Sequence, residues 1–271
     1  MTSGTAVVGK EFRSDYAAQR AAEGRAYDAA SLAVLPYLTT GPLARQWGVR
    51  ARSFDLLVDE ILGPMTATRD GSLDVLDVGA GCGWLSYRLA LAGHETVALD
   101  LRDDSVDGLG AAAAYLERNS NLFARVAATF DALPLASHTF DVAVFNASIH
   151  YALDLGAVLG EAVRVVRPGG RIIILDSPFY ATADQGDAMV REKHRNASRE
   201  FGARSSTLLA LAFVEYLTPQ RLSDASRGAR LGRWRRHRVR YPLWYELRGV
   251  RALVRGERTP SRFDLWECVA T

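Results

Sequence analysis

The most constraining feature of this chain is the segment LDVGAGCGWLSYRLA at positions 76–90. The branched and large apolar residues that end at Val78 suit a strand covered on both faces. Gly79, Gly81 and Gly83 follow at once, and glycine both tolerates positive φ and lets a ligand approach the backbone. A helix that starts near Trp84 would offer unpaired N–H groups to an anion. The segment therefore predicts a strand, a glycine turn and a helix that together hold a nucleotide-like ligand.

The spacing of these glycines narrows the choice of ligand. A dinucleotide fingerprint requires glycines in the order G-x-G-x-x-G, whereas Gly83 comes one position early and Trp84 occupies the expected place. A phosphate-binding P-loop requires a Lys followed by Ser or Thr, and no such pair follows the turn. The loop is thus neither of these two common nucleotide sites.

Three later segments complete the pattern. The residues ETVALD at 95–100 read as a second strand ending in Asp100, where a carboxylate can accept hydrogen bonds from two ribose hydroxyls. The residues 129–151, TFDALPLASHTFDVAVFNASIHY, place Asp131 in a polar loop before an apolar strand, FDVAVFN, and a polar turn. A further strand, RIIILD, follows an RPGG turn at 167–170.

In this order the segments resemble the class I S-adenosylmethionine-dependent methyltransferases, especially the branch of ubiquinone and menaquinone biosynthesis enzymes. The resemblance spans residues 73–178 and rests on the D-x-G-x-G-x-G loop, the acid that closes the second strand, the D-A-x-x-L-P-like segment and the RPGG turn. It implies a Rossmann-like α/β fold, S-adenosyl-L-methionine as cofactor, and transfer of a methyl group by direct displacement to a small-molecule acceptor. The acceptor is expected to be apolar or aromatic, with an oxygen, carbon or nitrogen nucleophile.

The resemblance also assigns expected roles to individual residues. Gly79, Gly81 and Gly83 would flank the methionine part of the cofactor, and Asp100 would bind the ribose. Asp131 with Ala132 would meet the adenine, and Asn146 with Ala147 would line the sulfonium side. The full set of expected cofactor residues is Asp77, Gly79, Ala80, Gly81, Gly83, Asp100, Leu101, Asp131, Ala132, Asn146 and Ala147.

Structural roles remain open for the three acids. Asp77 at a strand end can cap or orient the glycine turn instead of touching the cofactor. Asp100 can act as the N-cap of a following helix. Asp131 in a polar loop needs no special explanation.

The alternation of apolar strands with helical segments at 105–118 and 155–166 predicts a doubly wound, mostly parallel, seven-stranded sheet. Ligands of such sheets bind beyond the carboxyl ends of the strands. We expect a tail and helical cap over 1–62, the cofactor-binding core over 63–180, a helical insertion over 181–217 that serves as a substrate cap, and completion of the sheet over 218–271. The last two strands are expected at 234–240 and 263–270, with a helix between them at 242–255.

Aromatic residues in the N-terminal helices and the insertion suggest a lid. Tyr37, Arg45 and Trp47 are the candidates from the N-terminal helices. Together with the insertion, the aromatic set is Tyr37, Trp47, Phe179, Tyr180, Phe201, Phe213 and Tyr216. These rings either enclose an acceptor or only attach the cap to the core.

The length of the apolar runs and the number of cysteines indicate where the protein resides and which kinds of site it lacks. The sequence shows no leader with a cleavage site, and its apolar runs, such as 208–214, are too short to span a bilayer. Only Cys82 and Cys268 are present, which argues against a disulfide framework or a cysteine-rich metal site. We expect a cytoplasmic enzyme with no metal and no transmembrane segment.

Basic residues gather late in the chain although the net charge is only +2. Residues 221–262 hold 13 Arg against three acids. This basic tract is either a solvated face or a site for an acidic small molecule, an anionic membrane surface or nucleic acid. It leaves a nucleic-acid methyltransferase open as an alternative function. The resemblance implies that an amino-methylating enzyme of this superfamily would carry the motif N/D-P-P-F/Y after the FDVAVFN strand. This chain has NASI at 146–149 instead, so no stable nucleic-acid partner is expected. A protein that binds the cofactor without methyl transfer is the second alternative.

The candidate catalytic residues follow the strands that should border the acceptor. His150 lies just past FDVAVFN, and an imidazole with a pKa near neutrality can deprotonate a phenol, a hydroxyl or an activated carbon acid. The other expectation for His150 is a packing role. Tyr151 and Tyr180, with Asp176, are weaker candidates.

Overall fold

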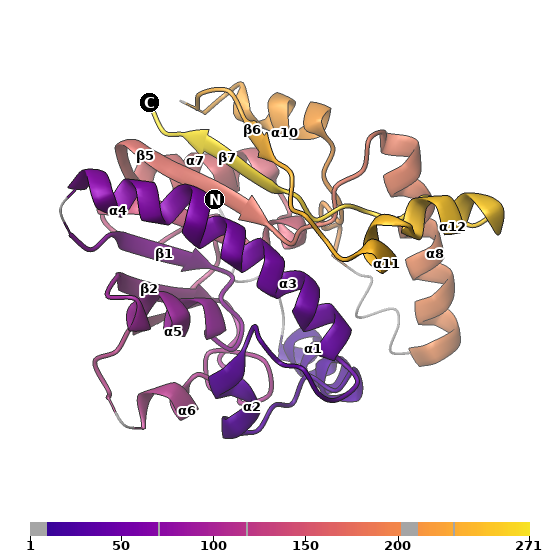
Figure 1. Ribbon diagram of the computed structural model, residues 1–271, viewed down its shortest axis with the longest axis horizontal. Helices are drawn as coiled ribbons and strands as arrows, with labels where there is room; N and C mark the ends of the chain where they lie inside the picture. Colours follow the sequence, from indigo (N-terminus) through magenta and orange to yellow (C-terminus); the bar gives the residue numbers. More distant parts are fainter. Residues whose placement is uncertain (1–9, 70, 118, 202–210, 230) are drawn as a thin grey trace.

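A seven-stranded sheet organises the computed structural model, which describes residues 10–69, 71–117, 119–201, 211–229 and 231–271. The strand order is β3-β2-β1-β4-β5-β7-β6, with β1 to β5 parallel and β7 antiparallel to both of its neighbours. The strands are β1 (Asp74–Val78), β2 (Glu95–Asp100), β3 (Ala124–Ala127), β4 (Phe140–Asn146), β5 (Val166–Leu175), β6 (Arg235–His237) and β7 (Leu265–Val269). The predicted doubly wound, mostly parallel α/β fold is confirmed (Figure 1).

The sheet is covered on both faces, as its apolar strands predict. Val75 packs in one hydrophobic cluster with residues of α3 (Ala44–Leu56) and α5 (Trp84–Leu91). Its neighbour Leu76 packs in the other cluster, with residues of α7 (Leu155–Val165) and α10 (Pro219–Ser226). Successive strand residues point to opposite faces, so the central strands must be apolar throughout. All seven residues of β4 are buried.

The N-terminal part is helical in several pieces. It comprises α1 (Lys10–Ala22), α2 (Ala29–Val34), α3, the π-helix η2 (Leu57–Leu62) and α4 (Gly63–Arg69). Gly24 adopts φ +77° after α1, and the Asp28 carboxylate caps α2 by accepting from the Ser31 amide. The helical cap expected within residues 1–62 is therefore broken by a glycine turn after α1. Most of the expected N-terminal tail lies outside the described residues.

The helix expected over 105–118 is wrong, because only α6 (Ala113–Leu116) is helical there. The Asp104 carboxylate accepts from the amides of Val106 and Asp107, which gives the backbone an alternative to a helix. The chain then folds back so tightly that a Cβ on Gly108 would lie 2.9 Å from the carbonyl oxygen of Arg102. Of the helix expected over 105–118, only one turn near the alanine run at 111–114 is formed.

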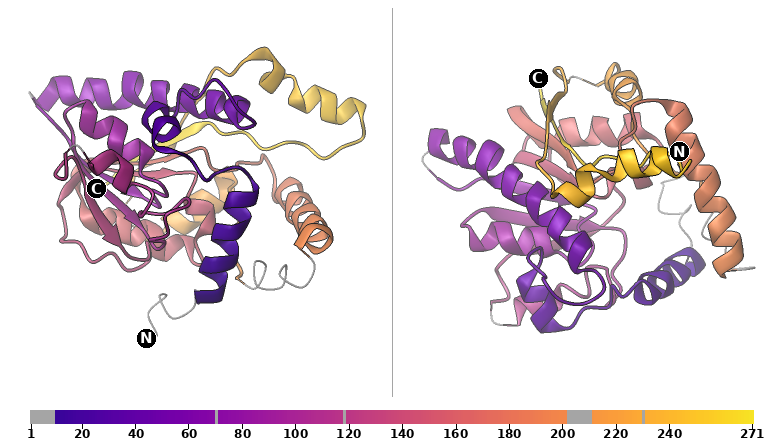
Figure 2. Two further views of the ribbon diagram at one scale, coloured as in Figure 1. Left: turned by 90° about the horizontal axis from the view of Figure 1, so that it is seen from below. Right: turned by 45° about the vertical axis from the view of Figure 1, so that its right-hand side comes forward.

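The insertion after β5 begins with α8 (Ala183–Phe201). Residues 202–210 and the side chain of Phe201 lie outside the described part of the chain, and residues 211–217 are not helical. Phe179 and Leu217 form an isolated parallel bridge, so the ends of the insertion meet. Between β6 and β7 the chain forms two helices, α11 (Leu243–Glu246) and α12 (Arg248–Val254); α12 overlaps α8 in Figure 1 but stands apart from it in the view from below (Figure 2). None of the helices described is long and apolar enough to cross a membrane.

Candidate functional site

A pocket opens at the carboxyl ends of β1, β2 and β4, where the predicted loops converge. Eight of the expected cofactor residues line it: Gly79, Ala80, Gly81, Asp100, Leu101, Asp131, Asn146 and Ala147. Asp77, Gly83 and Ala132 stand outside the lining formed by the described residues. The remaining lining comes from the N-terminal helices, from the loop after β2 and from the residues that follow β3 and β4.

The glycine turn after β1 has a geometric requirement at Gly79. Gly79 has φ +75°, and a Cβ at this position would lie 2.4 Å from the Cβ of Ser148. The turn and the residues after β4 therefore approach so closely that only glycine fits. Amides of Gly79 and Ala80 both donate to the Leu99 carbonyl, which ties the turn to the end of β2.

Asp100 holds the same turn through its carboxylate. One oxygen accepts from the Gly81 amide at 2.8 Å and the other from the Arg102 amide at 2.8 Å. Burial raises the pKa of Asp100, and the nearby Arg102 opposes this shift. The N-cap alternative does not describe this geometry, since the next helix, α6, begins only at Ala113.

Two buried acceptor atoms in the lining have no hydrogen-bond partner among the described residues: Oδ1 of Asp131 and Oδ1 of Asn146. Buried polar atoms are almost always paired, so unpaired ones in a pocket indicate a ligand that donates to them. An adenine amine and the ammonium of an amino acid are donors of this kind. The pair fits the expected cofactor.

Asp77 and Asp176 are buried carboxylates beneath the pocket. Asp77 accepts from the Ser86 hydroxyl at 2.9 Å, and burial raises its pKa to about 7. Asp176 accepts from the Ser53 hydroxyl at 2.6 Å, and burial raises its pKa to about 6. Asp176 and Ala147 follow neighbouring strands and have φ of 53° and 55°, a conformation that non-glycine residues adopt at a cost. Strain of this kind is typical of functional sites.

Four arginines line the pocket: Arg20, Arg25, Arg50 and Arg102. Arg50 projects from α3 and its guanidinium lies 5.0 Å from the ring centroid of Trp47. Burial and then the neighbouring Arg25 lower the pKa of Arg50, while Asp176 opposes the shift. Three of the four arginines already face carboxylates: Arg20 and Arg25 pair with Glu23, and Arg102 lies 3.3 Å from Asp104.

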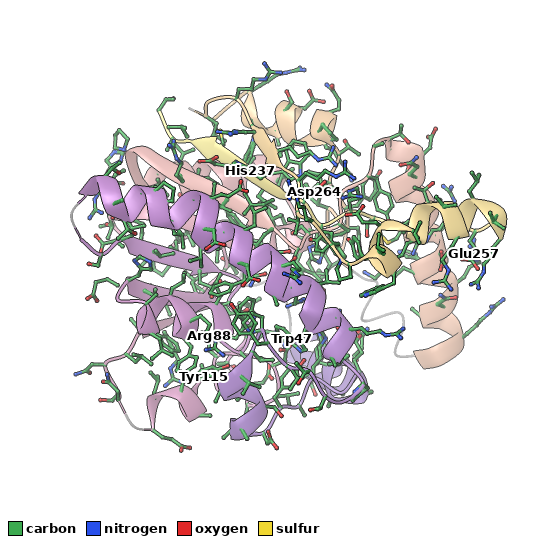
Figure 3. All side chains as sticks on the ribbon, in the orientation of Figure 1. Trp47, Arg88, Tyr115, His237, Glu257 and Asp264 are labelled. Atoms are coloured by element: carbon green, nitrogen blue, oxygen red, sulfur yellow. The ribbon has the colours of Figure 1, made fainter. Side chains whose placement is uncertain are left out.

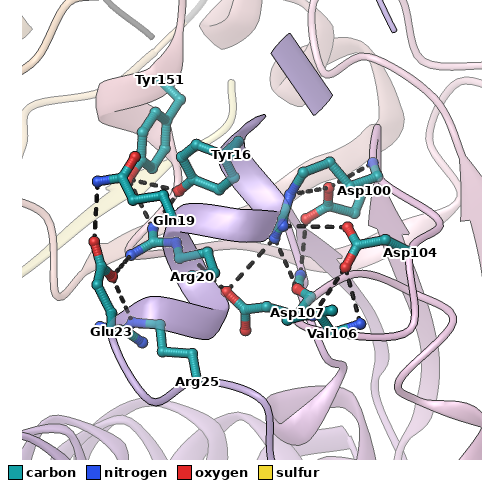
Figure 4. Close-up of polar contacts among 12 residues, drawn as sticks. Tyr16, Gln19, Arg20, Glu23, Arg25, Asp100, Asp104, Val106, Asp107 and Tyr151 are labelled. Carbon is teal, nitrogen blue, oxygen red and sulfur yellow. Dashed lines mark hydrogen bonds and ion pairs between the residues drawn. The ribbon is translucent and has the colours of Figure 1, made fainter. Parts of the chain in front are cut away.

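Helix α1 crosses the pocket and connects its two sides (Figure 4). The Tyr16 hydroxyl donates to the Tyr151 hydroxyl at 2.9 Å, and Arg20 donates to the same oxygen at 2.9 Å. The Arg20 guanidinium also lies 3.6 Å from Asp107, in the loop after β2. Burial opposes ionisation of Tyr151, but Arg20 and the hydrogen bond from Tyr16 outweigh it and lower the pKa of Tyr151.

The other two candidate catalytic residues have different surroundings. The His150 ring packs on Tyr151 with centroids 4.3 Å apart, and its Nδ1 lies 3.4 Å from the Ser177 hydroxyl. Burial and then Arg20 lower the pKa of His150 to about 3, so the imidazole is neutral and weakly basic. The Tyr180 hydroxyl accepts from Arg258 at 3.1 Å, and burial raises its pKa. Tyr151 is the one of the three that lines the pocket in the described part of the chain.

The proposed lid residues divide into two groups. Trp47 and Phe213 line the pocket. Trp47 belongs to α3, and its ring lies 5.6 Å from that of Trp84 at the start of α5 (Figure 3). Tyr37 is instead 46% exposed and donates to Asp55. Arg45 lies over Trp244 at 6.0 Å. The remaining rings pack elsewhere: Phe179 stacks on Trp266, and Tyr180 meets Tyr216 edge-on.

Sequence reasoning missed the lining residues Tyr16, Arg20, Arg25, Arg50, Arg102, Asp107 and Phe130. Arg50 follows Trp47 at the helical spacing i, i+3, so the two side chains share one side of a helix. This spacing was the one sequence signal that could have placed Arg50 beside the expected lid residue Trp47. The others come from separate segments that only the fold brings together. The structure also shows no group of three or more His, Cys, Asp or Glu side chains able to hold a metal ion within its described ranges.

Residues 76–174 match a family model described as a methyltransferase domain. The malonyl-[acyl-carrier protein] O-methyltransferase of Pseudescherichia vulneris is 36% identical over 137 residues, which are 48% of this chain and 51% of that protein. The ubiquinone/menaquinone biosynthesis C-methyltransferase UbiE of Rhizobium rhizogenes is 30% identical over 122 residues, 44% of this chain and 46% of that protein. The chain thus spans about half the length of these curated relatives.

The structure of a geranyl diphosphate methyltransferase in complex with GPP and sinefungin superposes with a TM-score of 0.57 at 16% identity. The match covers 91% of this chain and 87% of that chain. At this identity the likeness shows a shared fold, including the arrangement of the sheet on which the pocket is built.

Proposed function

We propose that this chain, whose core is a class I S-adenosylmethionine-dependent methyltransferase domain, transfers the cofactor's methyl group to an acidic small molecule with an apolar or aromatic part. The observation that carries this proposal is the pocket itself: a glycine turn, an acid after β2 and two unpartnered acceptors meet under helices that cover them. The matched relatives bear the names of O- and C-methyltransferases, so an oxygen or carbon nucleophile is expected here as well.

The residues present fit the cofactor. Asp100 would accept from the ribose hydroxyls with the lone pairs that the two backbone amides leave free. Asp131 would accept from the adenine amine and Asn146 from the methionine ammonium. Arg50 lies close enough to the glycine turn to affect the ionisation of Cys82, so it would pair with the methionine carboxylate. When bound, the cofactor supplies an electrophilic methyl group on a sulfonium.

The protein's own contribution is positioning, exclusion of water and proton removal. Helix α1 covers the pocket, and Trp47 and Phe213 give it apolar walls. A dry, oriented site can supply much of the rate of a displacement reaction. For an acceptor that must lose a proton, Tyr151 is the better base, because Arg20 stabilises its phenolate while His150 is barely basic. In this proposal His150 holds Tyr151 in place.

The acceptor class follows from the charges. Arg20, Arg25 and Arg102 line the pocket beside the cofactor's expected position, each with a carboxylate already within 3.3 Å, and Phe130, Phe213 and Tyr16 add aromatic surface. Arginine binds carboxylates and phosphates bidentately and also stacks on rings. We therefore expect a carboxylate or phosphate on the acceptor, and we expect the insertion at 181–217 to enclose its apolar part.

Two experiments test the function in sequence. Calorimetry should show binding of S-adenosylmethionine and its demethylated product but not of NAD, and Asp131→Ala should weaken binding while Asp103→Ala, an exposed acid of the neighbouring loop, should not. A screen of metabolite extracts with labelled methyl donor should then give a labelled anionic product. Binding of NAD alone would refute the cofactor, and cofactor binding without any labelled product would refute methyl transfer.

A further inference from the structure

The segment between β6 and β7 carries an apolar stripe on its outer side. Leu243, Leu247, Val250 and Val254 are 79%, 50%, 58% and 81% exposed. Their spacing, i, i+4, i+7 and i+11, is that of one side of a helix, and Leu247, which joins α11 to α12, keeps right-handed helical backbone angles. Leu253 beside them is 81% exposed. These five residues form the outer stripe, and they account for half of the exposed large apolar residues in the described part of the chain.

The opposite side of the same segment is attached firmly to the body of the protein. Tyr245 and Ala252 are buried, and the Tyr245 ring packs 4.1 Å from that of Tyr241. Arg248 lies 3.6 Å over the Tyr245 ring and donates to the Ser261 carbonyl at 2.8 Å. The segment therefore cannot rotate to bury the outer stripe without losing these contacts. Surface helices normally turn their apolar side inward, so this arrangement indicates a partner.

The charges next to the outer stripe are positive. Arg251 and Arg255 each follow a stripe residue by one position, about 100° around the helix, and both are exposed. Arg238 and Arg240 precede the segment and are exposed as well. The nearby acids pair with some of these arginines: Glu246 lies 2.9 Å from Arg262 and 3.6 Å from Arg238, and Glu257 lies 3.9 Å from Arg255. The surface thus combines apolar side chains with a surplus of arginine.

The segment projects from the body as an arm, with Glu257 at its outer end (Figures 2 and 3). It lies on the side toward which the arrows of the parallel strands β1 and β5 point, which is the side of the pocket (Figure 1). Trp244, 40% exposed, stands at the start of the arm. Tryptophan is enriched at the boundary between water and lipid.

We propose that the outer stripe docks this protein onto an anionic lipid surface. An interfacial helix buries its apolar side at the boundary of headgroups and acyl chains, and flanking arginines add attraction to anionic lipids. Nucleic acid would use the arginines but leave the aliphatic stripe in water.

Flotation with vesicles tests the proposal without any acceptor. The full chain should bind vesicles of equal parts phosphatidylcholine and phosphatidylglycerol, and bind phosphatidylcholine alone much less. The triple variant Leu247→Glu, Val250→Glu, Val254→Glu should lose about tenfold or more in partition, because it removes apolar burial and adds repulsion. Leu91→Glu on α5, where the leucine is 57% exposed, is the matched control and should bind like the wild type. Cofactor affinity should be unchanged in both variants.

Three results would overturn the proposal. The first is wild-type protein that fails to float with anionic vesicles, or a triple variant that floats as well as the wild type. The second is a light-scattering mass that corresponds to a dimer for the wild type and to a monomer for the triple variant. That result would make the outer stripe an interface between copies of this chain. The third is that the wild type binds duplex DNA at the salt concentration of the vesicle assay and the triple variant does not.

Discussion

Replacing Asp77 by Asn tests the reasoning about buried carboxylates most directly. Asp77 is 1% exposed, and its Oδ1 has no partner within the described residues. Burial raises its pKa to about 7, so the folded protein favours the protonated carboxyl. The stability that this group contributes is fully present below its ordinary pKa near 4 and is lost as the pH rises to about 7.

The magnitude follows from the size of the shift. A gap of about three pKa units corresponds to roughly 4 kcal/mol at 1.36 kcal/mol per unit. Asn is neutral at every pH and keeps the shape of the side chain. The free energy of unfolding of Asp77→Asn, minus that of the wild type, should therefore increase by up to about 4 kcal/mol between about pH 4 and pH 8.

Urea unfolding followed by tryptophan fluorescence measures this difference, since Trp47 and Trp84 are buried in the core near the turn. Groups that titrate equally in both proteins cancel in the subtraction. Burial also raises the pKa of Asp176, to about 6. Asp176→Asn should therefore gain stability relative to the wild type with rising pH as well, but by less than Asp77→Asn, and the gain should be complete at a lower pH. Parallel pH profiles for the wild type and Asp77→Asn would refute the reasoning.

Four further variants and one nucleic-acid assay test the proposed function. Asp100→Ala should weaken S-adenosylmethionine binding by about 30-fold to 1,000-fold, the equivalent of roughly 2–4 kcal/mol for two ribose hydrogen bonds to a carboxylate; an unchanged Kd with an intact fold would leave Asp100 with its structural role alone. Tyr151→Phe should lower kcat by about tenfold or more for an acceptor that must lose a proton, with cofactor affinity kept, and Tyr180→Phe should change neither; equal losses in both variants would contradict the assignment. Replacement of residues 181–217 by a short linker should abolish acceptor methylation while cofactor affinity stays within a few-fold, and retained turnover would sink the idea of a substrate cap. The protein should bind bulk DNA and RNA only weakly and without methylating them, and labelled nucleic acid would contradict that.

The sheet was predictable because its strands carry their own signal. A strand covered on both faces needs an unbroken apolar run, and FDVAVFN and RIIIL meet this condition. The turn after β1 was predictable from its glycines, since the close approach to Ser148 allows no side chain at Gly79. Asp100 could be placed in the pocket for the same reason: parallel strands end at one edge of the sheet.

The loop after β2 was not predictable from local preference. Alanines near 111–114 favour a helix, but the Asp104 carboxylate bonds to the next amides, and Gly108 and Gly110 pack on residues 102–104 of the same loop, which hold the chain in turns. The pocket's arginines were missed for a related reason. Arg20, Arg50 and Arg102 come from three separate elements, and each alone reads as a solvated charge.

The same arginines explain why the most conspicuous candidate base in the sequence is the weaker one in the fold. A histidine after β4 suggests a group that titrates near neutrality. In the folded protein burial, and after it the charge of Arg20, lowers the pKa of His150 to about 3, so the imidazole is neutral and only weakly basic. The identical field stabilises a phenolate, and it acts on Tyr151, which accepts directly from Arg20. The charge of Arg20 thus disfavours a protonated His150 and favours an ionised Tyr151, and this separates the roles that we propose for two adjacent residues.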